Sequence, residues 1–331
     1  MLLKLDHMIP PSYPINLNST ESPYHKYFHN YLVTLEHASD ADVALCGIPY
    51  DGGAIFKVGT SLGPKQIRKK GVALLRTFSI EQELDIKDYI RVIDIGDLEV
   101  VQDDIEETLL RIDELIKTLS RAKLIPLILG GDHSVTYQTA KSFIMEKKKR
   151  VGIIWFDNHL DTMSNFKGKK IFCGTPLFHI INELSDYVHP ENVVHIGSRG
   201  FDTSFSEWKN ARDLGIHIIK AEEVHIKGIQ FITDEAIRIA KKNTSHLYLS
   251  FDIDVTEGII APGCQCPRTG GLFPWQLLYA VRNISKSGVD IFDLMEVAPP
   301  MDVRDSTVQL AASLILEFLL GQAMRKANVN I

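Results

Sequence analysis

Three short apolar segments, each followed closely by aspartate or by aspartate and histidine, constrain the fold and the function of this chain most strongly. The run 151–156 (VGIIWF) leads directly into Asp157-Asn158-His159-Leu160-Asp161. Because an extended chain sends alternate side chains to one face, Asp157, His159 and Asp161 point the same way if the strand continues. Two other runs end in the same manner: 124–129 leads into Gly130-Gly131-Asp132-His133-Ser134, and 247–251 leads into Asp252-Ile253-Asp254.

Apolar strands alternate with helical patterns along most of the sequence. We expect helices near 65–75, 105–119, 134–147, 233–242, 275–287 and 306–326. We expect strands near 43–49, 92–96, 124–129, 151–156, 193–197, 216–219, 247–251 and 289–294. Such alternation predicts an α/β fold in which helices cover both faces of a mostly parallel sheet, giving three layers, α/β/α. Neither a linker nor a repeat interrupts the pattern, so we expect a single domain over residues 1–331, with an irregular N-terminal extension at 1–37.

Composition and charge exclude several classes of partner. At 331 residues the chain can bury a substantial core. A net charge of -6 and a pI near 6.1 argue against nucleic acid or an acidic membrane as the main partner. We find no apolar run that approaches the roughly 20 residues needed to span a bilayer, and no secretory signal near the N-terminus. The four cysteines do not resemble a disulfide framework, so we expect a cytoplasmic protein.

The residues at the three strand ends predict a binuclear metal site. In α/β proteins, functional sites lie at the carboxyl ends of the strands. A single aspartate there is usually a turn residue or a helix cap, and Asp132 or Ser134 is equally well explained as the cap of the next helix. Pairs of carboxylates on one face repel each other unless a cation lies between them. The candidate ligands are His133, Asp157, His159, Asp161, Asp252 and Asp254.

The number of carboxylates favours two metal ions over one. Four carboxylates around a single divalent ion would leave a strongly anionic site that is costly to bury. An oxygen-rich set with two imidazoles favours Mn²⁺ over Zn²⁺, with Ni²⁺, Co²⁺ and Fe²⁺ as alternatives. A pair of such ions lowers the pKa of bound water and polarises an acceptor carbon. Hydrolysis of an unreactive C–N bond is the reaction that suits such a site.

The same motifs resemble the three signatures of the ureohydrolase (arginase/agmatinase) family, in the family's order and spacing. The resemblance covers about residues 40–325. Further stretches that agree with it are 47–53 (GIPYDGG), 63–68 (GPKQIR), 261–263 (APG) and 296–302 (EVAPPMD). The last two stretches are more similar to agmatinases than to arginases.

This resemblance implies an arginase/deacetylase-like fold, two Mn²⁺ per chain and a homotrimer or homohexamer. It implies that Asp254 stabilises the tetrahedral intermediate or helps to move the proton, and that Glu296 binds the amino groups of the guanidinium. The alternative for Glu296 is a salt bridge or a cap. The implied ligands are His133, Asp157, Asp161 and Asp252 for one ion, and Asp157, His159, Asp252 and Asp254 for the other, with Asp157 and Asp252 as bridges.

The sequence departs from the family pattern at three places that concern the substrate. Asn158 stands where the family usually has alanine, so we include it among the candidate substrate-binding residues. Cys173 stands where agmatinases usually have a proton-shuttle histidine, and a thiol with a pKa near 8.5 is a poorer shuttle at neutral pH. Arg268 reverses the charge of the usual glutamate, because 264–268 reads Cys-Gln-Cys-Pro-Arg where Thr-Gly-Thr-Pro-Glu is usual.

The sequence therefore favours an agmatinase-like hydrolase that releases urea and an amine from a guanidino substrate. Arg268 and Cys173 favour an alternative, a hydrolase of an anionic guanidino acid (guanidinobutyrase-like) or a formimidoylglutamase-like enzyme that takes a formimino substrate. Deacetylase chemistry on one Zn²⁺ is disfavoured because every ligand for two ions is present. A non-catalytic metal-binding homologue is the alternative from a different class, and the intact ligand set and Glu296 argue against it.

Overall fold

The computed structural model describes residues 3, 5–13, 26–56 and 58–328. Within these residues, nine strands form one central sheet in which every pairing is parallel except that of β1 with β5. In spatial order the strands are β1 (Met8–Ile9), β5 (Val92–Leu98), β2 (Val43–Ile48), β6 (Ile125–Gly130), β11 (Ile291–Met295), β10 (His246–Asp252), β7 (Val151–Phe156), β8 (Val193–Ile196) and β9 (His217–Ile219).

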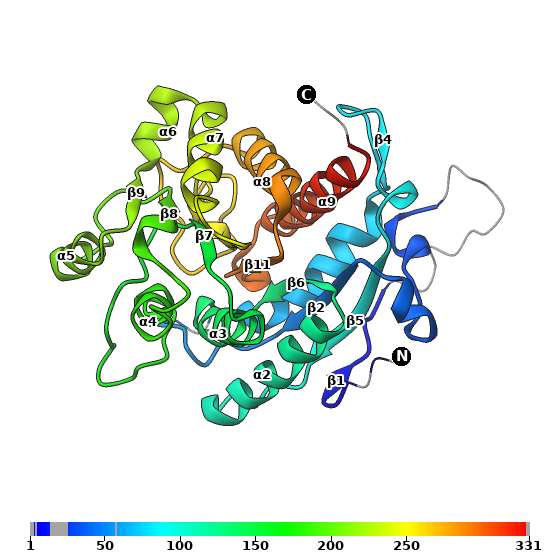
Figure 1. Cartoon of the computed structure of the whole chain (residues 1–331), viewed down its shortest axis with the longest axis horizontal. Coiled ribbons are helices and arrows are strands. Elements are labelled where there is room, and N and C mark those ends of the chain that lie inside the picture. Colours follow the sequence, from blue (N-terminus) through cyan, green and yellow to red (C-terminus); the bar gives the residue numbers. More distant parts are fainter. Residues whose placement is uncertain (1–2, 4, 14–25, 57, 329–331) are drawn as a thin grey trace.

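Helices cover both faces of this sheet, which confirms the predicted three-layer α/β/α architecture (Figure 1). One layer contains α2 (Ile105–Arg121), α3 (Thr136–Lys147) and α4 (Pro176–Glu183). The opposite layer contains α6 (Ala221–Lys227), α7 (Ile229–Ala240), α8 (Pro274–Gly288) and α9 (Ser306–Lys326). The remaining elements are α1 (Gly63–Gln66), α5 (Phe205–Leu214), and the short hairpin strands β3 (Phe78–Ser79) and β4 (Leu84–Asp85).

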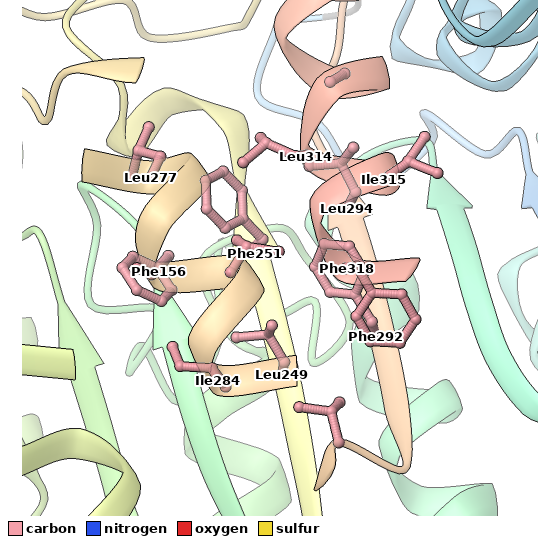
Figure 2. Packing of buried hydrophobic residues seen from close by; sticks show 14 of the residues in the cluster. Phe156, Leu249, Phe251, Leu277, Ile284, Phe292, Leu294, Leu314, Ile315 and Phe318 are labelled. Atoms are coloured by element: carbon pink, nitrogen blue, oxygen red, sulfur yellow. The ribbon is translucent and has the colours of Figure 1, made fainter. Parts of the chain in front are cut away.

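The strands are apolar along their whole length because both of their faces are buried. In β10, Leu249 and Phe251 pack toward α8 and α9, whereas Tyr248 packs in the opposite cluster with α2 and α3. Figure 2 shows Phe251 of β10 and Phe156 of β7 beside Leu277 of α8. These alternating contacts hold the central strands rigidly in the middle of the molecule, so the residues that follow them are rigidly placed too.

α9 is the one described helix that is long and apolar enough to cross a membrane, judged by length and composition. This differs from our expectation that no segment approaches that threshold. However, 78% of the apolar window is buried inside the protein. Phe318 of α9 stacks on Phe292 of β11 (Figure 2). α9 is therefore accounted for as a core helix of the α/β/α fold.

Several elements differ from the sequence-based expectation. α4, α5 and α6 were not expected. α5 and α6 each bury only two side chains and so carry no apolar stripe, whereas α4 is only eight residues long. The helix expected at 65–75 is broken into α1, a π-helical turn at 67–71 and a 3₁₀ turn at 72–74. Part of the extension expected to be irregular is ordered, since β1 pairs with β5; positions 1–2, 4 and 14–25 of that extension lie outside the described residues.

A buried arginine fastens the α1 segment to the sheet. Arg68 is 1% exposed, and its guanidinium donates to both carboxylate oxygens of Asp94, at 2.7 and 3.0 Å. It also donates to Asp97 and to the carbonyl oxygen of Gly96. The planar fork of arginine matches this arrangement, and lysine would not reproduce it.

We predict that Arg68→Met lowers the free energy of unfolding by about 3–5 kcal/mol, because it leaves Asp94 buried without a counter-charge. Urea unfolding followed by circular dichroism measures this loss. The exposed pair Lys209–Asp213 provides a matched control, and Lys209→Met should cost less than about 1 kcal/mol. Equal losses in the two variants would contradict a special role for the buried pair.

Candidate metal centre

Four adjacent strands deliver the predicted site residues to one edge of the sheet. β6, β11, β10 and β7 are neighbours in that order. In the β10–β7 register Phe251 lies opposite Phe156, so Asp252 and Asp157 follow side by side. His133 follows the end of β6, and Glu296 follows Met295 at the end of β11. The parallel topology therefore brings together residues that are up to 163 positions apart in the sequence.

The first group of ligand atoms surrounds the imidazole of His133. Its Nδ1 atom lies 3.1 Å from Asp157 Oδ2, 3.2 Å from Asp161 Oδ2 and 3.3 Å from Asp252 Oδ2. The opposite ring nitrogen, Nε2, lies 2.9 Å from the hydroxyl of Ser250. The ring also stacks on Trp155, with centroids 4.5 Å apart. These contacts aim Nδ1 at three carboxylates.

The second group surrounds His159. Its Nδ1 atom lies 3.0 Å from Asp254 Oδ2 and 3.5 Å from Asp157 Oδ1. Asp157 thus turns one oxygen to each imidazole. Two clusters of ligand atoms could each hold an ion: one is formed by His133, Asp157 and Asp161, and the other by Asp157, His159 and Asp254. Asp157 belongs to both clusters, as a bridging ligand does.

Backbone contacts and unusual dihedral angles fix these side chains. The backbone N–H of His159 donates to Asp157 Oδ1 at 2.6 Å, and that of Asp254 donates to Asp252 Oδ1 at 2.8 Å. Asp161 and Glu296 have φ angles of 52° and 67°, a left-handed conformation that is strained in residues other than glycine. Such strain is typical of functional sites. Asp132 instead accepts from the N–H groups of Gly53 and Ser134, so it is a cap.

Electrostatics show how poorly these groups tolerate one another without cations. Burial raises the pKa of Asp252, and the nearby charges of Asp254 and Asp157 raise it further. Burial and the charge of Asp157 likewise raise the pKa of Asp161. Burial alone would lower the pKa of His133, but the carboxylates of Asp157 and Asp252 beside its ring raise it well above its usual value. Without cations, the negative charge of the carboxylates favours protonation of Asp252, Asp161 and His133.

The polar atoms at the centre fit a pair of divalent ions. His133 Nδ1 and Asp161 Oδ2 are both buried, and neither has a hydrogen-bond partner. Buried polar atoms in proteins are almost always paired, so orphaned atoms that face each other across 3.2 Å indicate a missing shared partner. Carboxylates and imidazoles are the ligands of Mn²⁺ and related ions. The donor set therefore suits the predicted metals.

A cavity of about 230 Å³ opens onto this centre. Glu296 lies in its wall and is 4% exposed. One carboxylate oxygen, Oε1, accepts from the backbone N–H of His133 at 2.8 Å, and the other, Oε2, accepts from the side chain of Gln265 at 2.7 Å. Burial and the charge of Asp132 raise the pKa of Glu296 to about 8. A larger groove of about 950 Å³ lies along α2 and α3 and contains none of the six candidate ligands.

Two of the three residues at which the sequence departs from the family pattern line this cavity. Cys173 lines the cavity, and burial, with the charge of Glu296, raises the pKa of its thiol well above the usual value. The thiol is therefore neutral near pH 7. Arg268 also lines the cavity, but its Nε atom is 2.6 Å from Asp202 Oδ2 in a salt bridge.

Asn158 does not lie where a substrate-binding residue is expected. Its side chain is 1% exposed and is absent from the cavity wall. Its amide nitrogen lies 3.5 Å from His159 Nε2, on the side of the ring away from Asp254. In this structure the side chain of Asn158 lies beside a candidate ligand and not in the cavity wall, and its role in substrate binding stays a prediction.

Sequence reasoning missed several residues that support the centre. Ser250 links His133 Nε2 to the buried carboxylate of Asp293, which also accepts from Thr136 and Tyr248. Asp202, Glu207 and Gln265 line the cavity together with the predicted residues. Ser250 is part of the third signature, so its position two residues before Asp252 could have identified it. Asp202 and Glu207 lie on or beside the unexpected α5 and carried no such signal.

Comparison with known proteins identifies the family to which this chain belongs. The model of the Arginase family matches residues 41–321. The mitochondrial agmatinase of Gallus gallus is 33% identical over 85% of this chain and 81% of that protein. The mitochondrial guanidino acid hydrolase of Homo sapiens is 32% identical over 84% of this chain and 77% of that protein.

A solved structure has the same fold. The crystal structure of Trypanosoma cruzi formiminoglutamase with Mn²⁺ matches with a TM-score of 0.83 at 23% identity, over 91% of this chain and 99% of that one. The family match spans most of the chain, and the strand ends that carry the six candidate ligands lie within it. The chain belongs to the arginase family and is a metal-dependent amidinohydrolase.

Proposed function

We propose that this enzyme hydrolyses a guanidino C–N bond with two Mn²⁺ ions and releases urea and an amine, with agmatine as the nominal substrate. The observation that carries the proposal is that one small cavity is lined by members of both candidate ion-binding clusters and by the buried carboxylate of Glu296. Asp161 of the first cluster and His159 and Asp254 of the second reach its wall. A planar cation with several N–H groups and an electrophilic carbon fits between these two features. His133, Asp157, Asp161 and Asp252 would hold one ion, and Asp157, His159, Asp252 and Asp254 the other.

The bound ions supply an activated water nucleophile and polarise the acceptor carbon. The chain's own residues orient the substrate and handle protons. Glu296 accepts N–H groups of the guanidinium, and its burial strengthens that charge-assisted contact. Asp254 Oδ1 accepts from the backbone N–H of Asn158, whereas its Oδ2 atom faces His159 and the cavity. These contacts support the proposal that Asp254 stabilises the tetrahedral intermediate or accepts a proton.

Cys173, a candidate catalytic residue, stands where a shuttle histidine is usual, and we propose that it does not act as the shuttle. A shuttle must gain and lose a proton near the working pH. Because its pKa is raised well above the usual value, the thiol stays protonated there and is a poor shuttle. Its backbone N–H donates to the carbonyl of Gly53, which ties the loop around Cys173 to the loop 53–56. We propose that Cys173 forms part of the cavity wall beside Glu296.

The tail of the substrate meets an ion pair at the cavity wall. Arg268 favours a carboxylate tail, as in a guanidino acid, whereas Asp202 favours the ammonium of agmatine. Because the two side chains neutralise each other at 2.6 Å, neither charge dominates. The sequence-based argument from Arg268 to an anionic tail did not include this partner, so the preference for the tail stays a prediction. The relatedness to a human guanidino acid hydrolase supports the anionic substrate as the second candidate.

The assembly and the compartment are proposals that rest on the family resemblance and on composition. We propose a homotrimer or homohexamer in the cytoplasm, with neither nucleic acid nor membrane as a partner. The net charge of -6 supports the absence of a nucleic-acid partner.

Metal content tests the binuclear site. Mn²⁺-loaded, desalted protein should contain about two equivalents of metal by mass spectrometry. Asp157→Ala should lose both ions, because Asp157 faces both imidazoles. Asp132→Asn is the control, since Asp132 adjoins His133 but acts as a cap, and it should keep both ions. One tightly bound Zn²⁺ without a second site would contradict the proposal.

Opposite substitutions in the ion pair test whether it determines the preference for a cationic or an anionic substrate tail. Arg268→Gln removes the arginine partner of Asp202, which keeps only its 4.0 Å contact with His159 Nε2. The ratio of kcat/KM for agmatine over 4-guanidinobutyrate should therefore rise by about tenfold or more. Asp202→Asn leaves Arg268 unpaired, so the same ratio should fall by a similar factor. Steady-state kinetics with both substrates give the two ratios. If both variants keep the native ratio, this pair does not read the tail.

A further inference from the structure

Gln265 lies between Glu296 and the loop 53–56, and the proposed function gives it no task. Its Nε2 atom is 2.7 Å from Glu296 Oε2, and its Oε1 atom accepts from the backbone N–H of Phe56 at 3.1 Å. It also lines the 230 Å³ cavity. In the family pattern this position is usually glycine, which has no side chain to make either contact.

The two partners fix the orientation of the carboxamide. The oxygen and nitrogen of an amide are assigned from the hydrogen bonds around them. The backbone N–H of Phe56 can only donate, so it requires the amide oxygen on its side. The NH₂ group must then face Glu296, where a carboxylate oxygen accepts it. Gln265 therefore has one orientation, and in it the side chain can only donate to Glu296.

This contact determines how many acceptor positions Glu296 has left. A bound cation favours the ionised form of Glu296, and an ionised carboxylate offers about four lone-pair positions, two on each oxygen. The backbone N–H of His133 uses one on Oε1, and Gln265 uses one on Oε2. One position therefore remains on each oxygen. Two parallel N–H groups on a planar N–C–N unit fill such a pair of positions, as in bidentate contacts between guanidinium and carboxylate.

We propose that Gln265 is a positioning residue that fixes the carboxylate plane of Glu296 and thereby selects amidinium and guanidinium groups over simple ammonium groups. This inference rests on the proposed function, because it assigns the substrate's planar cation to Glu296. The side chain is anchored at both ends, so the carboxylate cannot turn without breaking the contact with Gln265. A mobile carboxylate would accept one N–H group as readily as two. The fixed one favours the planar, two-pronged cation.

Binding of two small cations tests this inference without any turnover. Acetamidinium presents two parallel N–H groups on a planar N–C–N unit, whereas methylammonium presents a single nitrogen. We would measure their dissociation constants by calorimetry in the Mn²⁺-loaded native enzyme, in Gln265→Leu and in Gln265→Met. Both substitutions remove the amide and keep a side chain of similar size. Acetamidinium should bind about tenfold more weakly to both variants, and methylammonium should change by less than about twofold.

Gln102 offers a matched control. Its side chain also joins loop segments, since Nε2 donates to Pro49 O and Oε1 accepts from the N–H of Asp51, but it does not touch Glu296. Gln102→Leu should leave both dissociation constants within about twofold of native. In parallel kinetics, Gln265→Leu should raise KM about tenfold with little change in kcat, because the contact aids binding of the ground state.

Three results would overturn the inference. The first is native affinity for acetamidinium in both Gln265 variants. The second is an equal loss for acetamidinium and methylammonium, which indicates general damage to the cavity. The third is the same loss in Gln102→Leu, which indicates loop anchoring alone. An absence of urea release by the native enzyme from every guanidino compound tried would count against the proposed function, whereas the cation affinities would still decide the role of Gln265.

Discussion

The repulsion among buried carboxylates at the ends of adjacent parallel strands is the constraint on which the rest of the structure depends. Asp157, Asp161, Asp252 and Asp254 are each less than 5% exposed and lie around only two imidazoles. Such a concentration of charge is costly to bury unless cations neutralise it. The core beneath it is accordingly rigid and apolar, and it holds the ligands together against their mutual repulsion. The raised pKa values of Asp161 and Asp252 are the signs of that cost.

The hydrogen bonds around the centre fix the orientation of the ligand side chains. The contact between Ser250 and His133 Nε2 leaves Nδ1 as the atom that faces the carboxylates. A fixed second nitrogen sets the orientation and the tautomer of a ligating imidazole. The left-handed backbone of Asp161 and Glu296 turns their side chains into the cavity. Strained residues of this kind persist only where the surrounding structure determines them, which here is the end of the packed sheet.

Much of the fold and most of the candidate ligands could be predicted from local pattern. The strands are nearly continuous apolar runs, because a parallel sheet is buried on both faces, and their ends mark the site. The helices that pattern analysis missed are short or have little apolar surface: α4 has only eight residues, and α5 buries only Glu207 and Ala211. The pairing of Arg268 with Asp202 and the contact between Gln265 and Glu296 join distant segments. Only the folded structure shows such partners, so the sequence indicated the charge of Arg268 but not its neutralisation.

The central claim is that these six residues together hold two ions that share Asp157, and anomalous X-ray scattering at the manganese edge tests it most directly. For crystals grown with Mn²⁺, the account predicts two anomalous peaks, one beside His133 Nδ1 and Asp161, the other beside His159 Nδ1 and Asp254. Asp157 should lie between the two peaks. A single peak, or a second peak away from His159, would contradict the account.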